Sequence, residues 1–346
     1  MSDREDEGLG CPVPFSAYER VVLAHGGGGR ATLRLIESLF LPCFDTPELR
    51  EGNDGAVVAL EGPIAITTDA FTVRPLFFPG GDIGSLAIHG TVNDLACCGA
   101  RPELCTVSFV LEEGLALATL ERIARSMAEA ARACGVRVVS GDTKVVERGR
   151  GDGVYVSVTG LGRVRAPLSP RAVRPGDVVI VSGPIGDHGI AVLVAREEVR
   201  VGTEVTSDSG EIASLVHALL DESVALRAVR DPTRGGLATV LCEIARTADV
   251  AIALDEAAVP VRAGVADACE LLGLDPLYVA CEGRAVLFVA PEDAARALAV
   301  ARRFHPEAAR VAEVLAEPRA TVIAQNPFGA ERVLDLLSGE QLPRIC

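Results

Sequence analysis

The stretch Pro167–Asp177, PLSPRAVRPGD, divides the sequence into two halves. It carries three prolines and no apolar periodicity, and proline neither continues a helix nor donates to a central strand. At 346 residues the chain is too long for one ordinary hydrophobic core and fits two domains. The sequence therefore predicts an α/β (α+β) protein with one domain over residues 1–166, a second over 167–337 and a mobile tail over 338–346.

Short apolar runs predict strands on both sides of this boundary, and longer amphipathic patterns predict helices. Before the boundary, the expected strands cover residues 56–60, 64–68, 103–111, 136–140 and 154–162, and the expected helices cover 32–39, 83–98 and 117–134. After it, we expect strands over 178–182, 251–254 and 285–290, and helices over 212–229, 234–248, 263–272, 293–303 and 328–337.

Charge and composition restrict the function. The chain has 33 basic and 48 acidic residues, a net charge of -15, which repels nucleic acid and anionic lipid. No apolar run approaches the ~18 residues of a membrane span, and the acidic N-terminus lacks the features of a signal peptide. We therefore expect a cytoplasmic protein with no nucleic-acid or membrane partner. Most of its ten cysteines read as buried packing residues, but Cys346 stands apart as the last residue.

Four aspartates lie beside glycine, threonine or asparagine at the end of an apolar run: Asp54 in GNDGA, Asp69 in TTDAF, Asp94 in VNDLA and Asp142 in SGDTK. Mg²⁺ takes carboxylate oxygens as ligands and usually brings a polyphosphate with it. Aspartate beside glycine is also ordinary turn and cap chemistry. Four such stretches in one expected domain favour the metal interpretation.

Lys144, in SGDTK, is the only lysine of the chain, since every other basic residue is arginine. A compact ammonium beside Asp142 indicates a point charge that the planar fork of arginine does not replace. The competing interpretation is that a single lysine remains at this position by chance. The position of Lys144 in an acidic motif favours a functional role.

Two glycine-rich stretches are candidate anion sites. HGGGGR, His25–Arg30, exposes backbone N–H groups that can approach a phosphate, although a flexible linker fits equally and no P-loop pattern is present. In DPTRGG, Thr233 or Asp231 could cap a helix whose first turn opens with Gly235 and Gly236. A capped helix that packs closely and binds nothing is nearly as good an interpretation.

Glu282, in CEGRAVLFVA, precedes an apolar strand and stands near Arg284. A poised base and a salt-bridge partner of Arg284 remain equally good interpretations of this carboxylate.

Several motifs together resemble the hydrogenase maturation factor HypE family, in the aminoimidazole ribonucleotide synthetase (PurM-like) superfamily. The resemblance covers nearly the whole chain and is carried by AHGGGG, EGNDGAVV, TTDAFTVRPLFFPGGDIGSLAIHGTVNDLACCGARP, SGDTKVVERG, DPTRGGLATVL and the closing PRIC. It implies two α/β domains, with the N-terminal sheets of two subunits meeting in a homodimer and ATP bound in a cleft near that interface.

The resemblance also implies an activity. A carbamoyl group delivered by the partner HypF would be attached to the thiol of Cys346, and ATP would drive its dehydration from thiocarboxamide to thiocyanate. The nitrile would become the cyanide ligand of the iron in nickel–iron hydrogenase, passed on through the HypC–HypD complex. Carried over, Lys144 would steady the γ-phosphate, Glu282 would be the candidate base, and Asp54, Asp69, Asp94 and Asp142 would hold Mg²⁺. The expected ATP site comprises Gly26, Gly27, Gly28, Asn53, Asp54, Asp69, Asp94, Gly141, Asp142, Thr143, Lys144, Gly235 and Gly236.

Other functions share some of these features. Thiamine monophosphate kinase has similar acidic motifs but no use for a C-terminal cysteine. Selenophosphate synthetase would need a reactive residue near the start, where Cys11 lacks a following lysine. An ATP-sensing scaffold that docks HypC–HypD without catalysis is a third possibility. One departure from the HypE pattern is Cys242, where an amide residue is expected.

Overall fold

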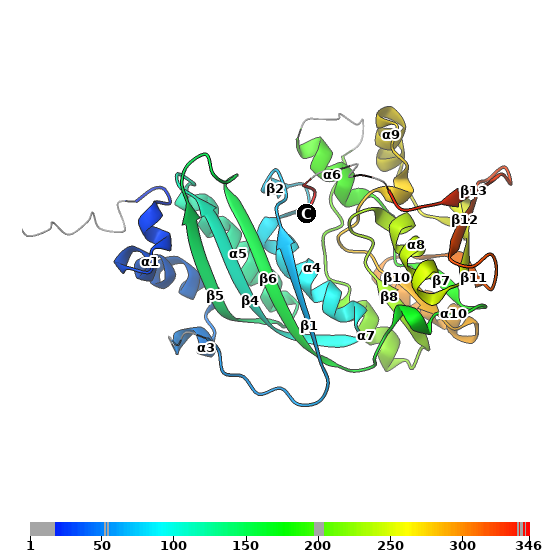
Figure 1. Cartoon of the computed structure of the whole chain (residues 1–346), viewed down its shortest axis with the longest axis horizontal. Coiled ribbons are helices and arrows are strands. Elements are labelled where there is room, and N and C mark those ends of the chain that lie inside the picture. The colour runs from blue at the N-terminus through cyan, green and yellow to red at the C-terminus, as the bar shows by residue number, and fades with distance from the viewer. Residues whose placement is uncertain are drawn as a thin grey trace, which may run out of the picture.

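A computed structural model describes residues 18–51, 53, 55–196, 204–337, 339, 342 and 344–346. Its first half is built on a four-stranded sheet (Figure 1). The strands are β1 (Ile64–Phe71), β4 (Ala100–Glu112), β5 (Arg137–Val146) and β6 (Val154–Val164), in the spatial order β1-β6-β4-β5. Within it β4 and β5 pair in parallel, and the other neighbours are antiparallel.

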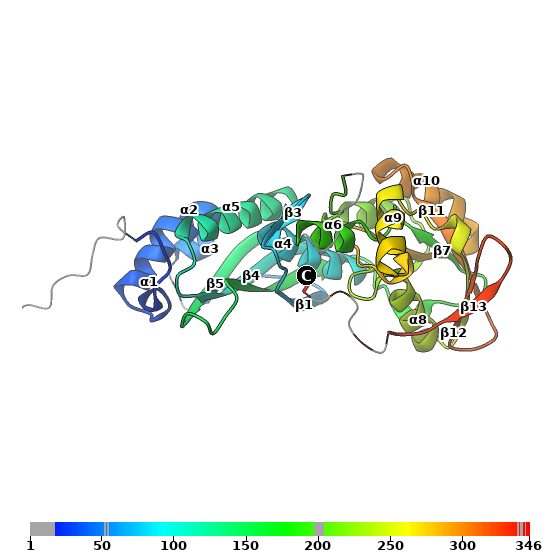
Figure 2. The ribbon, with the colours of Figure 1, turned by 90° about the horizontal axis from the view of Figure 1, so that it is seen from above.

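Two helices, α4 (Ile83–Cys97) and α5 (Leu117–Ala133), cover one face of this sheet (Figure 2). The alternation along β6 shows why: Val154, Val156 and Val158 are buried against the helices, whereas Tyr155 and Ser157 on the opposite face are half-buried. α4 begins at Asp82, whose carboxylate accepts hydrogen bonds from the first helical N–H groups. The sheet therefore presents its second face uncovered in this chain.

Short helices and one hairpin complete the first half. The glycine-rich segment η2 (Leu23–Gly26) lies along β5 and leads into α1 (Arg30–Leu35), a single π-helical turn (Ile36–Phe40), α2 (Leu41–Phe44) and α3 (Pro47–Arg50). The hairpin of β2 (Phe77–Phe78) and β3 (Gly81–Asp82) precedes α4.

The second half is built on a seven-stranded sheet in the order β13-β12-β9-β11-β7-β10-β8. Its strands are β7 (Val178–Val181), β8 (Leu226–Arg230), β9 (Ala251–Asp255), β10 (Val286–Val289), β11 (Ala309–Leu315), β12 (Thr321–Gln325) and β13 (Glu331–Leu334). Its helices are α6 (Asp187–Ala195), α7 (Ala213–Asp221), α8 (Gly236–Ala248), α9 (Ala263–Leu272) and α10 (Ala294–Phe304). Short 3-10 turns lie at Pro170–Ala172, Glu256–Ala258, Pro276–Tyr278 and Pro291–Asp293.

The central strands of this sheet are buried on both faces. In β7, Val178 and Ile180 join the core that contains α6, α7 and α10, while Val179 and Val181 join the core under α8. A strand between two helical layers needs a continuous apolar run in place of alternation. That is the reason VVIV is apolar at every position.

The two halves are joined through an apolar interface. α4 packs against α7 and β8, and one continuous buried cluster runs from α4 and α5 into α6 and α7. Leu342 and Ile345, near the end of the chain, belong to the same cluster. Figures 1 and 2 accordingly place the C-terminus between the two halves.

Three expected elements were wrong. Residues 328–337 form no helix: Asn326 accepts N–H groups of Phe328 and Ala330 in a tight turn, Gly329 adopts φ +81, and β13 pairs back onto β12. The expected helix 212–229 ends at Asp221 because residues 226–230 form β8. Residues 56–60 form no strand, and a run of five apolar residues with no pairing partner explains the error.

The remaining expected elements are confirmed, with ends that shift by a few residues, and the α/β class is confirmed. The elements α2, α3, α6, β2, β3, β8, β11, β12 and β13 were not predicted. The proposed domain limits stay predictions. Across the described residues, no helix is long and apolar enough to cross a membrane.

Candidate active site

Two acidic side chains meet where β1 adjoins α4. Asp69 faces the helix, because its partner in β6 is the buried Val158 and its carboxylate lies near Gly90. Asp94, on α4, accepts a hydrogen bond of 2.6 Å from the hydroxyl of Thr67. Burial raises the pKa of Asp94, and the nearby Asp69 adds to the increase, while the Thr67 hydroxyl opposes it. These two predicted residues therefore lie together on the helix-covered face of the sheet.

Asp231 extends this acidic group from the second half of the molecule. It follows β8, and its carboxylate lies 3.7 Å from the thiol of Cys97. Burial raises the pKa of Asp231 to about 7, with repulsion from Asp94 as the next cause. The sequence analysis considered Asp231 only as a helix cap, and this was wrong: residue 235 is the N-cap of α8, without a side-chain cap. The DPTRGG motif was the signal that could have identified Asp231.

Glu282 completes the cluster. Its side chain is 2% exposed, and its Oε1 atom has no hydrogen-bond partner among the described residues. Burial raises the pKa of Glu282 well above its ordinary value, and Asp231, Asp208 and Asp69 raise it further, while Arg234 lowers it. An acid that is buried close to other carboxylates favours its protonated form, which disposes it to hold and exchange a proton.

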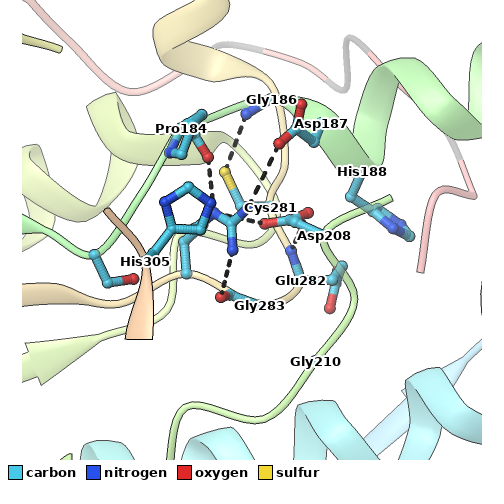
Figure 3. Close-up of polar contacts among 12 residues, drawn as sticks. Pro184, Gly186, Asp187, His188, Asp208, Gly210, Cys281, Glu282, Gly283 and His305 are labelled. Atoms are coloured by element: carbon cyan, nitrogen blue, oxygen red, sulfur yellow. Dashed lines mark hydrogen bonds and ion pairs between the residues drawn. The ribbon is translucent and has the colours of Figure 1, made fainter. Parts of the chain in front are cut away.

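Arg284 does not pair with Glu282, so the salt-bridge interpretation of Glu282 fails. Its guanidinium lies 3.5 Å from Asp187 and 3.6 Å from Asp208, and it donates to the carbonyl of Pro184 at 2.9 Å. Figure 3 shows Glu282 pointing away from this ion-pair group, which contains Asp187 and Asp208.

The start of α8 borders the same cleft. Gly235 is the N-cap with φ +79, and Gly236 begins the helix with φ +62. A Cβ on Gly236 would lie 2.6 Å from the carbonyl oxygen of Leu277, so close packing accounts for that glycine. Gly235 and Arg234 line a cavity of about 300 Å³ together with Leu342 and Ile345. The helix start thus faces the C-terminal segment.

A second group of predicted residues lies elsewhere, at the edge of the sheet. On β5, the ammonium of Lys144 lies 3.0 Å from the carboxylate of Asp142, and both side chains are exposed. Thr143, between them, is buried, and Gly141 is exposed. The Gly26–Gly28 turn lies against this strand, and a Cβ on Gly26 would be 2.4 Å from the backbone nitrogen of Val145.

These two groups face opposite sides of one sheet. Asp142 pairs with Ser108, which pairs with Ser157, which pairs with Ala70. Asp142 is therefore in register with Ala70, the residue after Asp69, across three strand spacings or about 14 Å. Because successive residues of a strand point to opposite faces, Asp142 lies on the uncovered face and Asp69 on the other. Asn53 is exposed, and Asp54 lies outside the described residues. The described chain alone does not bring all the predicted ATP-site residues to one point.

The chemistry of the cluster fits a divalent cation, although no three acidic, histidine or cysteine side chains of the described residues are arranged as a metal site. Asp69, Asp94 and Asp231 concentrate carboxylate oxygens in a partly buried place, and a hard cation would relieve their repulsion. Asp142 is too far from them to share one ion within this chain.

Comparison with known proteins agrees with this architecture. Residues 52–164 match the N-terminal domain, and residues 174–325 the C-terminal domain, of AIR synthase related proteins. The fold and the interdomain cleft thus define an AIR synthase-related protein. Carbamoyl dehydratase HypE of Cupriavidus necator is 52% identical over 98% of both chains, and that of Escherichia coli K12 is 43% identical over 94% of this chain and 99% of its own. The chain belongs to the HypE family of hydrogenase maturation proteins, the carbamoyl dehydratases.

Solved structures lead to the same family. A HypE crystal structure in complex with ATP superimposes with a TM-score of 0.91 and 46% identity, covering 94% of this chain and 99% of that one. HypE from a HypE–HypF complex has a TM-score of 0.77 and 42% identity, covering 88% and 99%. Thiamine-monophosphate kinase of Stenotrophomonas maltophilia K279a has a TM-score of 0.61 at 20% identity over 80% and 89%, a likeness of fold alone.

Proposed function

We propose that this chain dehydrates a carbamoyl group carried on the thiol of Cys346, converting the thiocarboxamide to a thiocyanate in the interdomain cleft. The observation that carries the proposal is Glu282: a buried acid whose Oε1 lacks a partner among the described residues. Its charge interacts with Arg234, which lines the cavity that Leu342 and Ile345 of the C-terminal segment also line. An amide loses two N–H protons on becoming a nitrile, so a proton acceptor is required there.

Glu282 is the proposed acceptor. Its raised pKa makes the carboxylate a stronger base than an exposed glutamate once it is ionised. The neighbouring carboxylates Asp231 and Asp69 repel a second negative charge, which favours the protonated form of Glu282 after the transfer. Arg234 and the N-terminus of α8 offer positive potential to an anion in the same cleft.

Bound ATP supplies the phosphoryl group that turns the carbamoyl oxygen into a leaving group. Lys144 and the Gly26–Gly28 turn are the proposed contacts of its phosphates, and Asp69 and Asp94 the proposed ligands of Mg²⁺, together with Asp54 and Asp142. The exposed ammonium of Lys144 is held by Asp142, which leaves its other donors available to a phosphate.

A homodimer is part of this proposal, because the uncovered sheet face carries Lys144 and Asp142 away from Glu282. That face also exposes Ile64 and Ile66, at 41% and 66%. Two sheets that pack through it would bury these side chains and bring the β5 edge of one subunit toward its partner.

HypF is the proposed donor of the carbamoyl group, supported by the HypE–HypF complex of a relative. HypC–HypD as acceptor of the cyanide, and a cytoplasmic location, are predictions of the sequence that nothing further tests.

The proposal is tested by intact-mass measurement of the chain after incubation with HypF, carbamoyl phosphate and ATP. The wild type should gain the mass of a carbamoyl group and then lose the mass of one water. Glu282→Gln should acquire the carbamoyl group and stop there, with dehydration slowed at least about 100-fold because an amide does not accept the proton.

Glu243→Gln is the matched control, since Glu243 lines the cavity beside the C-terminal segment but is only half-buried and is paired with Arg230. It should dehydrate at nearly the wild-type rate. Normal nitrile formation by Glu282→Gln would refute the role of Glu282 as base, and a carbamoyl adduct on a residue other than Cys346 would refute the proposed carrier.

A further inference from the structure

The last three residues of the chain are held by their backbone carbonyl groups. The carbonyl of Arg344 accepts from the N–H of Arg74 at 3.2 Å and from the guanidinium of Arg196. That of Ile345 accepts from Nε2 of His188 at 2.6 Å, and that of Cys346 from the N–H of Thr72 at 3.0 Å. The N–H groups of residues 72 and 74 thus bond to alternate residues of the segment, in which Arg344 adopts φ 55.

Side chains add specificity to this backbone recognition. Ile345 is 3% exposed, and Arg344 pairs with Asp152 while donating from Nε to the carbonyl of Thr72 at 3.1 Å. Asp152 also lies 3.6 Å from Arg74. The segment 344–346 is thus recognised by three carbonyls, one buried apolar side chain and one ion pair, which together form a peptide groove.

His188, on α6, is the buried centre of this groove. Its side chain is fully buried with one edge against the ring of Phe78, and burial lowers its pKa, which favours the neutral ring. A carbonyl only accepts, so Nε2 carries the proton toward Ile345. Nδ1, 2.8 Å from the hydroxyl of Ser207, is therefore the acceptor of that hydroxyl. The two contacts of His188 are consistent with one tautomer.

The segment Ser207–Gly210 connects His188 to Glu282. The Asp208 carboxylate accepts from the N–H of Glu282 at 3.2 Å, and the Glu282 carbonyl accepts from the N–H of Gly210 at 3.2 Å. A Cβ on Gly283 would lie 1.9 Å from the carbonyl oxygen of Asp208, so the two segments are in direct backbone contact. Figure 3 shows Asp208 between His188 and Glu282, with Gly210 further along the same segment.

We propose that His188 is a positioning residue that links docking of the C-terminal segment to the placement of Glu282. One side of its ring holds Ile345, beside the reacting Cys346, and the other holds Ser207, beside the residue that anchors the Glu282 backbone. The groove of Thr72, Arg74, Asp152, His188 and Arg196 takes as its ligand an Arg-Ile-Cys segment whose arginine adopts φ 55. The inference deepens the proposed function and rests on Cys346 and Glu282 being the reacting pair.

The groove is tested in the full chain, without ATP or HypF, by the rate at which iodoacetamide alkylates Cys346, measured by mass spectrometry of the C-terminal peptide. His188→Ala should raise this rate about tenfold, since the lost bond shifts the segment out of the groove. His217→Ala is the matched control, because His217 also lies near a backbone carbonyl, that of Ala100 at 3.2 Å, but far from the tail. It should leave the rate unchanged.

His188→Gln retains an amide donor and should restore most of the protection of Cys346. Should His188→Ala fail to fold, Asp152→Asn gives an independent test, because it removes the charge that Arg344 pairs with and should also raise the alkylation rate. A free peptide of sequence QLPRIS should accelerate alkylation of wild-type Cys346 at millimolar concentration by displacing the tail, and QLPRDS should not. Equal rates in wild type, His188→Ala and Asp152→Asn would overturn the groove.

The link to Glu282 is tested by single-turnover dehydration of chain already carbamoylated. His188→Ala should slow this step more than it slows carbamoylation by HypF, and His188→Gln should recover it. If the alkylation results hold but the wild type never loses water, the proposed function fails while the groove stands. If dehydration is normal in His188→Ala despite faster alkylation, the link between His188 and Glu282 fails.

Discussion

Two regions of the chain differ in their exposure to water: the buried acids around Glu282 and Asp231, and the β5 edge with Lys144 and Asp142. In the cleft, Glu282 and Asp231 are removed from water, their pKa values are raised, and the C-terminal segment is docked. At the β5 edge, Lys144 and Asp142 are exposed and form an ion pair, and the hydrogen bond from Lys144 lowers the pKa of Asp142. Burial raises the pKa values of the acids in the first region, the property on which the proposed proton transfer rests, whereas the charged side chains of the second region are exposed.

This difference indicates that the two groups of predicted site residues lie on opposite faces of one sheet. Asp69 shares its face with α4, and Asp142 lies on the other face, separated by β4 and β6. Rearranging a hydrogen-bonded sheet to bring them together would break its ladders. In the proposed homodimer, a second copy that approaches the uncovered face would supply the missing part without such a change.

The largest expected effect comes from mixing two inactive variants. Lys144→Arg and Glu282→Gln should each lose dehydration at least about 100-fold. If each site takes Lys144 from one subunit and Glu282 from the other, refolding the two variants together in equal amounts should restore roughly a quarter of wild-type sites, because half of the dimers are mixed and each has one intact site. Turnover of the mixture measures this recovery.

A mixture of Lys144→Arg with a second preparation of Lys144→Arg controls for refolding and should stay inactive. Absence of recovery in mixed dimers, verified by mass, would show that both residues act within one chain.

The second prediction concerns the acidic cleft and pH. Burial raises the pKa of Asp231 to about 7 in the folded protein, from an ordinary value of 3.8, so the folded state binds more protons between these pH values. Its contribution to stability is therefore full below about pH 4 and is lost as pH rises through 7. In metal-free buffer, Asp231→Asn should gain roughly 2 kcal/mol over the wild type between pH 4 and 8, after allowance for solvent screening.

Urea unfolding at several pH values measures this difference. The exposed Asp267, changed to Asn, provides the control and should follow the wild-type curve. A constant gap between Asp231→Asn and the wild type across the range would contradict the raised pKa.

The smallest effect separates two adjacent glycines at the β5 edge. Gly26→Ala should cost about 1 to 2 kcal/mol, because its Cβ would meet the backbone nitrogen of Val145 at 2.4 Å. Gly27→Ala should change stability by less than about 0.5 kcal/mol, since the nearest atom to its Cβ is 3.8 Å away and its φ is -90. Thermal unfolding of both variants measures these changes in stability. An equal loss of stability in the two variants would mean that the turn does not pack closely against β5.

Several site residues could be predicted from short motifs because their chemistry is local. Asp69 lies within β1 and Asp94 within α4, Gly235 and Gly236 stand at a helix start, and Glu282 precedes a strand. Asp231 was missed as an acid because its raised pKa depends on Asp94, in the other half of the molecule. His188 was not singled out, since nothing near it in sequence indicates the tail that it contacts.

The sequence by itself determined the secondary structure of most segments, since periodicity is a local property: VVIV is apolar throughout because both its faces are covered, and β6 alternates because one face is not. Only the tertiary structure decided that residues 331–334 form a strand, that Asp69 and Asp142 face opposite ways, and that Cys346 lies beside Thr72. The physical reason is distance along the chain. Thr72 and Cys346 are separated by 274 positions. Their contact depends on sheet register and on the apolar interface between the halves, neither of which any short window of residues contains.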